Sequence, residues 1–178
     1  MTPYDAIVSK RDTRNFDGRQ IPEDVLRRIL QAGRMAGSAK ALEPVQFVVV
    51  REQGQKEALA ACGNFTPHLP PAAAVVALVL EPEMGVVGAP LTHFRGPFDA
   101  GRVAQNMMVA AWAEGAASCP ASMHQGEEAA KALGLPEGYV VANTIAFGYP
   151  GETEETRPSR PRKPLDEYVH WERWDAGA

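Results

Sequence analysis

Cysteine is scarce in this chain of 178 residues, which contains only Cys62 and Cys119. The two cysteines have neither the spacing of a metal site nor the density of a disulfide framework. A chain of this length buries enough apolar surface to fold without crosslinks. We therefore predict two buried thiols, no metal site and a reducing compartment, with the cytoplasm as the location.

Long hydrophobic runs and an excess of basic residues are also missing. The longest apolar run covers residues 72–80, whereas a membrane-spanning helix needs about 20 apolar residues. The first ten residues contain no apolar core of a secretory signal. The formal net charge is -4 and the pI is about 5.6, whereas nucleic-acid-binding domains usually carry a basic face. We predict no membrane span and no nucleic-acid partner.

The motifs that most often mark a catalytic or nucleotide site are absent. The sequence has no GxGxxG after a strand, no phosphate-binding loop, no HExxH and no GxSxG. Its four histidines, His68, His93, His124 and His170, are scattered. We assign no catalytic triad and no general acid from them. These absences favour a reaction carried by a bound cofactor.

What the sequence does contain is an alternation of helices and strands without an internal repeat, which predicts a single domain over residues 1–178. A Thr-Pro pair at residues 2–3 is typical of a helix start. Residues 81–97 predict a long loop of the kind that serves as a lid or binding segment. Helices are predicted at about 3–10, 22–33, 55–63, 99–116 and 126–134, and strands at 45–51, 72–80, 118–122 and 139–150.

Two basic clusters lie almost a chain length apart. Arginine suits phosphate because its guanidinium pairs with two oxygens at once. Three prolines within the second cluster would stiffen it and reduce the entropy lost on ordering. The residues alone leave two interpretations open, a shared anion site or two solvated loops. The first cluster contains Lys10, Arg11 and Arg14, and the second contains Arg157, Arg160, Arg162 and Lys163.

Five segments, in order along nearly the whole chain, resemble the FMN-dependent nitroreductase family. The resemblance implies an α+β fold, with a mixed β-sheet flanked by helices. It also implies an interlocked homodimer in which a C-terminal arm, residues 150–178, packs on the partner subunit. Three exposed aromatics after the last strand would suit such an arm. The segments are "SKRDTRNFDGRQIPEDVLRRILQAG", "GSAKALEPVQFVVV", "DAGRVAQNMMVAAWAEGAASC", "ALGLPEGYVVANTIAFGYP" and "RPRKPLDEYVHWERW".

The resemblance also implies where FMN would bind. Both basic clusters would converge on one FMN phosphate in a cleft at the dimer interface, and a small-residue loop would come from the partner chain. Family positions fall on Lys10, Arg11, Asp12 and Arg14, on Ser38 and Ala39, on Pro120, Ala121, Ser122 and Met123, and on Arg160 and Arg162. The chain departs from the family pattern at Asp12, where serine is usual, and at Ala41, Glu43 and Val45.

The function implied by the resemblance is an FMN-dependent oxidoreductase of ping-pong type. NADH or NADPH would reduce the flavin, and a small planar acceptor such as a nitroaromatic, a quinone or another flavin would reoxidise it. Two alternatives stay open. Asp12 and Ser122 resemble residues of the branch that uses O2 to fragment FMN into dimethylbenzimidazole, although an ion pair of Asp12 with Arg11 or Arg14 is the simpler interpretation. The third possibility is a flavin-binding module without turnover.

Overall fold

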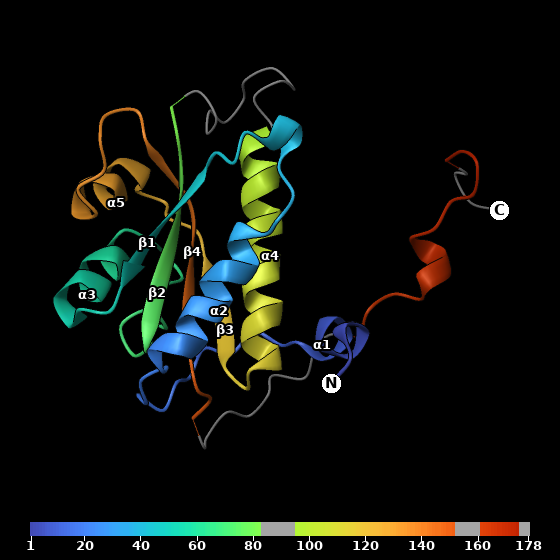
Figure 1. Ribbon diagram of the computed structural model, residues 1–178, viewed down its shortest axis with the longest axis horizontal. Helices are drawn as coiled ribbons and strands as arrows, with labels where there is room; N and C mark the ends of the chain where they lie inside the picture. Colours follow the sequence, from blue (N-terminus) through green and yellow to red (C-terminus); the bar gives the residue numbers. More distant parts are fainter. Residues whose placement is uncertain (83–94, 152–160, 175–178) are drawn as a thin grey trace.

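A four-stranded sheet occupies the centre of the computed structural model, which describes residues 1–82, 95–151 and 161–174 (Figure 1). The strand order is β1-β2-β4-β3, and all three pairings are antiparallel. The predicted mixed sheet is therefore wrong for the described strands, because the one parallel bridge among the described residues joins Ser118 of β3 to Asp12, which belongs to no strand. The strands are β1 (Val45–Val50), β2 (Ala74–Leu80), β3 (Ala117–Ala121) and β4 (Val140–Gly148).

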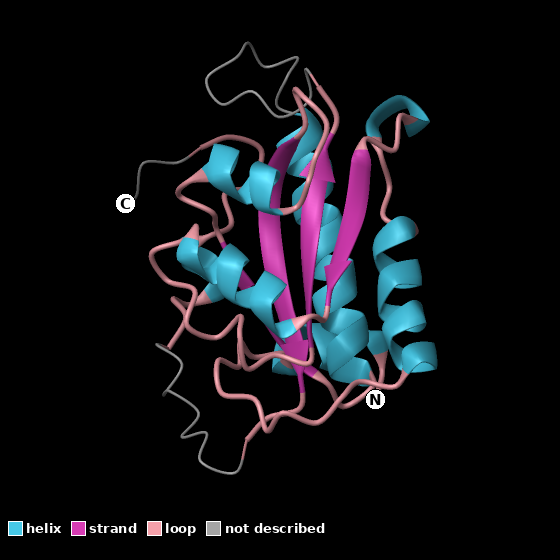
Figure 2. Cartoon of the chain, turned by 90° about the vertical axis from the view of Figure 1, so that its left-hand side faces the viewer, coloured by secondary structure: helices cyan, strands magenta, loops and turns pink. Residues whose placement is uncertain are grey.

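Helices cover both faces of the sheet (Figure 2). Alternate residues of β2 separate two cores: Val76 and Leu78 join the core under α2 and α4, and Val75 joins the core under α3 and α5. Every residue of β2 is consequently buried, which explains why an antiparallel strand reads as one continuous apolar run. The helices are α1 (Pro3–Ser9), α2 (Glu23–Arg34), α3 (Gln53–Ala61), α4 (Arg95–Ala113) and α5 (Gly126–Ala132).

Most of the predicted elements exist, with ends within about two residues of the predicted ranges. Thr2 caps α1 as expected, and it forms a capping box with Asp5. The helix predicted at 99–116 is the exception, since α4 runs from Arg95 to Ala113. Pro97 suggested a loop, but proline is tolerated in the first turn of a helix, where its missing N–H needs no partner. The rest of the predicted 81–97 loop lies largely outside the described residues.

The segment that follows α1 is fixed to the edge of the sheet. The Trp112 indole of α4 donates a hydrogen bond to Ser9 Oγ (2.9 Å), at the end of α1. The Thr13 N–H then donates to the Ser118 carbonyl on β3 (3.0 Å), and the Asp17 N–H donates to the Tyr149 carbonyl after β4 (3.0 Å). These contacts hold the first basic cluster beside β3 and the C-terminal half of α4.

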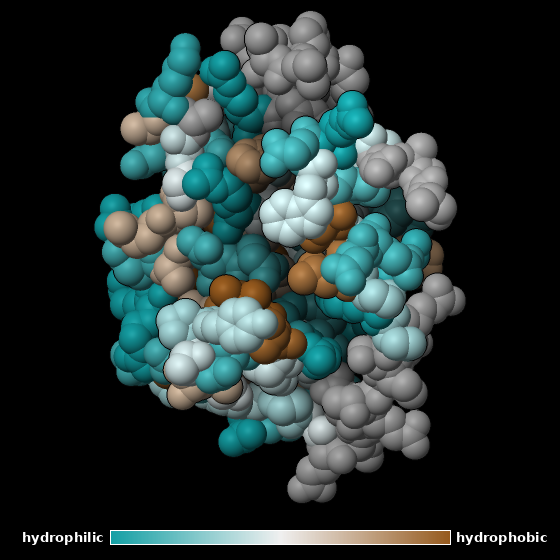
Figure 3. All heavy atoms as spheres, turned by 90° about the vertical axis from the view of Figure 1, so that its right-hand side faces the viewer, coloured by the Kyte–Doolittle hydropathy of each residue, from teal (hydrophilic) through white to brown (hydrophobic). Residues whose placement is uncertain are grey.

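The C-terminal residues 161–174 leave the body of the molecule as an extended arm that includes the short helix η3 (Leu165–Glu167) (Figure 1). Its large side chains are exposed, and Trp171 has 82% of its surface open to solvent. His170 stacks on Trp174 with ring centroids 4.0 Å apart. Figure 3 views the face that carries this arm, where apolar side chains, in brown, interrupt the hydrophilic surface. The exposed apolar side chains of the arm and of α1 are Leu165, Tyr168, Trp171, Trp174, Tyr4, Ile7 and Val8.

Ile29 tests the packing of α2 against α4 and the sheet. Its side chain is fully buried in the core, so Ile29→Ala should lower the free energy of unfolding by about 2–4 kcal/mol. Arg27, exposed on the same helix and paired with Glu23 at the surface, provides the control, because Arg27→Ala should cost under about 1 kcal/mol. Urea unfolding measures both, and equal effects would contradict this core.

Candidate functional site

Two pockets meet at Pro120, on the edge strand β3. The first, which we call the basic pocket, lies between α1, α4 and the start of the arm, and has a volume of about 940 Å³. The second, which we call the histidine pocket, lies between the α3–β2 connection and the end of β3, and has a volume of about 540 Å³. Because Pro120 lines both, a ligand longer than either pocket could occupy the two together.

The basic pocket brings side chains of the two predicted clusters together. Lys10 and Arg11 come from the end of α1, and Arg162 comes from the arm. Arg11 Nη1 donates to the carbonyls of Val8 (3.0 Å) and Lys10 (2.9 Å), which orients its guanidinium at the end of the helix. The complete lining consists of Ile7, Val8, Lys10, Arg11, Asp12, Gln105, Met108, Pro120 and Arg162.

Asp12 is the one acidic residue of this lining, and its carboxylate forms an ion pair with Lys10. The expected ion pair of Asp12 with Arg11 or Arg14 is therefore wrong, because Asp12 pairs with Lys10 instead. Lys10 also lies 3.5 Å from the Met108 sulfur, so it is largely buried against α4 while Asp12 stays open to solvent. An incoming anion would compete with Asp12 for the Lys10 ammonium.

The histidine pocket contains donors and no carboxylate among its lining residues. Thr66 Oγ1 donates to the carbonyls of Ala60 (2.6 Å) and Gly63 (3.0 Å), which folds the α3–β2 connection over the end of β3. A Cβ atom at Gly63 would lie 3.1 Å from the Ser122 carbonyl oxygen, so glycine permits this close approach. The lining consists of Arg14, Asn64, Phe65, Pro67, His68, Pro120, Ala121, Ser122 and His124.

His68 is the most buried polar residue of the histidine pocket, with 2% of its surface exposed. Neither ring nitrogen makes a hydrogen bond of good geometry to the described residues, although the Cys119 backbone lies close enough to interact with the ring. Burial lowers the pKa of His68, and the positive charge of Arg14 lowers it further, against opposing effects of the Cys119 backbone and Asp12. His68 is therefore a neutral ring that retains unused hydrogen-bonding capacity, and a polar ligand in this pocket would relieve that cost.

The residues predicted from the resemblance fall into separate places. Lys10, Arg11, Asp12 and Arg162 line the basic pocket, while Arg14, Ala121 and Ser122 line the histidine pocket, and Pro120 lines both. Met123 packs against the core beneath α3 and α5. Arg160 lies outside the described residues. Ser38 and Ala39 lie elsewhere, at the other end of α4.

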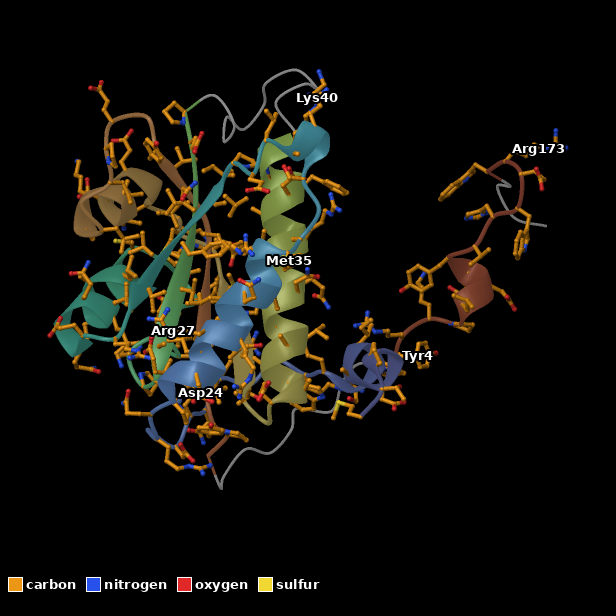
Figure 4. All side chains as sticks on the ribbon, viewed as in Figure 1. Tyr4, Asp24, Arg27, Met35, Lys40 and Arg173 are labelled. Atoms are coloured by element: carbon orange, nitrogen blue, oxygen red, sulfur yellow. The ribbon has the colours of Figure 1, made fainter. Side chains whose placement is uncertain are left out.

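The Ser38 loop is built around the N-terminal end of α4. Ser38 Oγ donates to Asp99 (2.8 Å) and accepts a hydrogen bond from the Glu43 N–H (3.0 Å), in a pocket that also contains Val45. Lys40, in the short helix η1 (Ala39–Ala41), has a positive φ of 56°. Figure 4 shows Lys40 at one end of α4 and Tyr4, on α1, near the other. Within one chain this loop and the basic pocket thus contact different stretches of α4, the loop at Asp99 and the basic pocket at Gln105 and Met108.

Sequence reasoning missed Asn64, Phe65, His68 and His124. Both histidines were dismissed as scattered, because 56 positions separate them along the chain. Only the sheet order brings the α3–β2 connection next to the end of β3. The available signal was the Gly-Asn-Phe-Thr-Pro-His run that follows α3, in which glycine, asparagine and proline are typical of a turn that carries functional residues.

The other negative expectations concern metals, membranes and thiols. In the described ranges no group of three or more potential ligands could hold a metal ion. None of the helices in the same ranges is long and apolar enough to span a bilayer. Both cysteines are buried free thiols, as predicted.

The sequence model of the Nitroreductase family matches residues 7–149. The chain belongs to the nitroreductase family. That range contains the α-helical and β-strand core, most of the basic pocket and the whole histidine pocket, and it excludes the arm. Family membership confirms the resemblance proposed from the sequence.

Relatives of this nitroreductase-family chain include a protein of Archaeoglobus fulgidus, provisionally named NADH dehydrogenase/NAD(P)H nitroreductase. The two sequences are 27% identical, and the match covers 94% of this chain and 96% of the relative. The NADH dehydrogenase of Thermus thermophilus is 28% identical, and the match covers 93% of this chain and 94% of that protein. Among solved structures, the NADPH:FMN oxidoreductase of Vibrio harveyi, complexed with NAD+, superposes with a TM-score of 0.86. That match has 24% identity and covers 99% of this chain and 79% of that one.

His68 should make the stability of the protein sensitive to acid. Its folded pKa lies below the ordinary value of 6.5, so the unfolded chain takes up the proton first as the pH falls. Stability is then lost from about pH 6.5 downward, as far as the folded pKa. His68→Gln removes this titration, and urea unfolding at pH 7.5 and 5.5 should show a smaller loss for the variant. Equal losses in wild type and variant would contradict a neutral, buried His68.

Proposed function

We propose that the protein is an FMN-dependent oxidoreductase of ping-pong type. It would oxidise NADH or NADPH and reduce a small, flat, electron-poor acceptor such as a nitroaromatic, a quinone or another flavin. The observation that carries the proposal is the meeting of Lys10, Arg11 and Arg162 in one pocket, beside a second pocket that is rich in donors and is also lined by Pro120.

The basic pocket suits the phosphate of FMN. A phosphate accepts several charge-assisted hydrogen bonds, and arginine offers two parallel donors to it. Lys10 and Arg11 would hold the phosphate from the α1 side and Arg162 from the arm. Phosphate binding would weaken the ion pair between Asp12 and Lys10, and this cost would lower the affinity for FMN.

The histidine pocket suits the ring system of the same molecule. When bound, FMN supplies reversible hydride transfer, which no side chain of this chain provides. Pro120, Ala121 and Ser122 would support the ring at the end of β3. Arg14 would stabilise negative charge at the ring, and His68 would offer it the hydrogen-bonding nitrogens that have no described partner. Burial keeps His68 neutral, so it adds no second positive charge beside Arg14.

We also propose a homodimer in which the arm packs on the partner subunit. The exposed aromatic side chains of the arm support this, because a monomer would leave them in water. The separation of the Ser38 loop from the basic pocket supports it too. In a dimer the partner's Ser38 and Ala39 would complete the site. A monomer in analytical ultracentrifugation would contradict this assembly. The cytoplasmic location stays a prediction.

The activities after which relatives and fold neighbours are named agree with this chemistry. The Thermus thermophilus relative is an NADH dehydrogenase, and the Vibrio harveyi neighbour is an NADPH:FMN oxidoreductase. A neighbour from Clostridium difficile is an FMN-dependent nitroreductase, with a TM-score of 0.81, 19% identity and coverage of 96% and 99%. These names support flavin and nicotinamide as the pair of reactants for this chain.

The arrangement favours this reaction over oxidative fragmentation of FMN. That alternative needs Asp12 and Ser122 at one reacting centre. Asp12 lines the basic pocket and pairs with Lys10, whereas Ser122 lines the histidine pocket. Asp12 is thus placed beside the proposed phosphate position rather than beside the ring.

Absorption spectroscopy tests the proposed function directly. The purified protein should bind FMN, show the flavin bands near 450 nm, and lose them when NADH or NADPH is added without oxygen. A protein that does not bind FMN would overturn the proposal. Bound FMN that neither nucleotide reduces would instead indicate a binding module without turnover.

Arg162 should discriminate FMN from riboflavin, which lacks the phosphate. Losing one charge-assisted contact costs about 1.5–3 kcal/mol, so Arg162→Ala should weaken FMN binding by roughly 10- to 100-fold and leave riboflavin binding nearly unchanged. Arg27→Ala, on the distant helix α2, should change neither affinity. Flavin fluorescence quenching measures all of these. An equal loss for both flavins would place the phosphate elsewhere.

A further inference from the structure

Phe65 and His124 form the exposed rim of the histidine pocket. Phe65 has 78% of its surface open to solvent, and its ring meets the His124 ring edge to face, with centroids 6.1 Å apart and planes at 61°. An exposed phenylalanine beside an imidazole offers a flat ligand an apolar surface together with a polar contact.

The His124 ring is fixed by the backbone around it. Its Nδ1 accepts a hydrogen bond from the Asn64 N–H (3.2 Å). The N–H groups of His124 and Gln125 both donate to the Cys62 carbonyl at 3.0 Å. Since Nδ1 accepts a hydrogen bond, the proton of the neutral ring lies on Nε2. Nε2–H is therefore the group of this side chain that can donate to a ligand.

The charges around this donor favour a ligand oxygen that becomes negative. Among the residues that line the pocket, the ionisable groups are Arg14, His68 and His124, all of them bases. Two acidic residues act on this region from outside the pocket lining: Asp12, which lines the basic pocket and acts on His68, and Glu128 of α5, which acts on Cys62. Prearranged donors aimed at a developing negative charge stabilise the transition state that carries it.

We propose that His124 binds and polarises the acceptor of the reaction, by donating a hydrogen bond from Nε2 to a quinone carbonyl or nitro oxygen. This inference rests on the proposed function and adds to it the residue that selects acceptors with an oxygen at the reacting end. Phe65 would pack against the acceptor ring. No residue in the sequence analysis was assigned this role.

The chemical step is balanced without a proton from His124. A quinone gains a hydride, which is two electrons and one proton, whose source is NADH or NADPH. Its second proton comes from water, and the product is a hydroquinone. His124 keeps its Nε2 proton throughout. It donates only a hydrogen bond while negative charge develops on the acceptor oxygen. NADH or NADPH is oxidised to the corresponding nicotinamide cation.

Two variants separate the two nitrogens of His124. In His124→Asn the side-chain oxygen can replace Nδ1 and keep the contact with Asn64, but no group reaches the Nε2 position. In His124→Gln the longer side chain restores a donor near Nε2. We expect His124→Asn to lower kcat/KM for menadione, a quinone, by at least 10-fold, and His124→Gln to recover part of that loss.

Ferricyanide provides the matched control, because it takes up single electrons and has no oxygen to polarise. Its reduction should change by less than twofold in both variants. Equal losses with menadione and ferricyanide, or no loss with menadione, would overturn the role of His124. If the wild-type protein fails to oxidise NADH and NADPH when either menadione or ferricyanide is present, the proposed function itself would be overturned.

A second measurement needs no turnover and no variant. Nitrogen-15 NMR of the histidine rings in the flavin-free protein at pH 8 should show His124 with its proton on Nε2. A proton on Nδ1 would overturn the proposal, because the hydrogen bond from Asn64 that orients the ring would then be impossible. This measurement can overturn the proposal even if His124→Asn fails to fold.

Discussion

Like charges repel, so Lys10, Arg11 and Arg162 can share one pocket only where the surrounding structure holds them together. The end of α1 holds the first two, because Arg11 donates to the carbonyls of Val8 and Lys10 and the Trp112 indole anchors Ser9. The strand edge then fixes Thr13 to Ser118. Asp12 offsets part of the charge through its ion pair with Lys10. An anion bound in the pocket would offset the remainder, and the rest of the proposed site extends from that anchor.

Helix α4 determines the geometry of the candidate site. Near its N-terminal end it holds the Ser38 loop through Asp99, and further along it meets Lys10 at Met108. The nine residue steps from Asp99 to Met108 correspond to about 14 Å of helix. Under the proposed function, one chain would present two incomplete parts of a site on different stretches of the same helix. A second subunit, with its arm crossing over, would bring complementary parts together, which gives the exposed arm a structural purpose.

Local signals in the sequence predicted the elements well, and tertiary pairing accounts for most of the errors. The Thr2 capping box, the apolar stripe of α2 and the run of β2 each determine their own structure. The sequence could not show whether the strands pair in parallel or antiparallel fashion. β2 is buried on both faces, and such an apolar run is compatible with either kind of pairing. The place of His68 and His124 in one pocket depends on which strands are neighbours. The partner of Asp12 is instead local, because Lys10 lies two positions before it. The resemblance placed the basic residues, yet it offered nothing for the two histidines.

The central claim is that basic side chains from both ends of the chain hold one FMN phosphate. A crystal structure of the protein grown with FMN tests this most directly. We expect the phosphate in the basic pocket, within hydrogen-bonding distance of Lys10, Arg11 and Arg162, and the ring beside Pro120–Met123. A phosphate that binds away from these side chains, or FMN bound outside both pockets, would contradict the account.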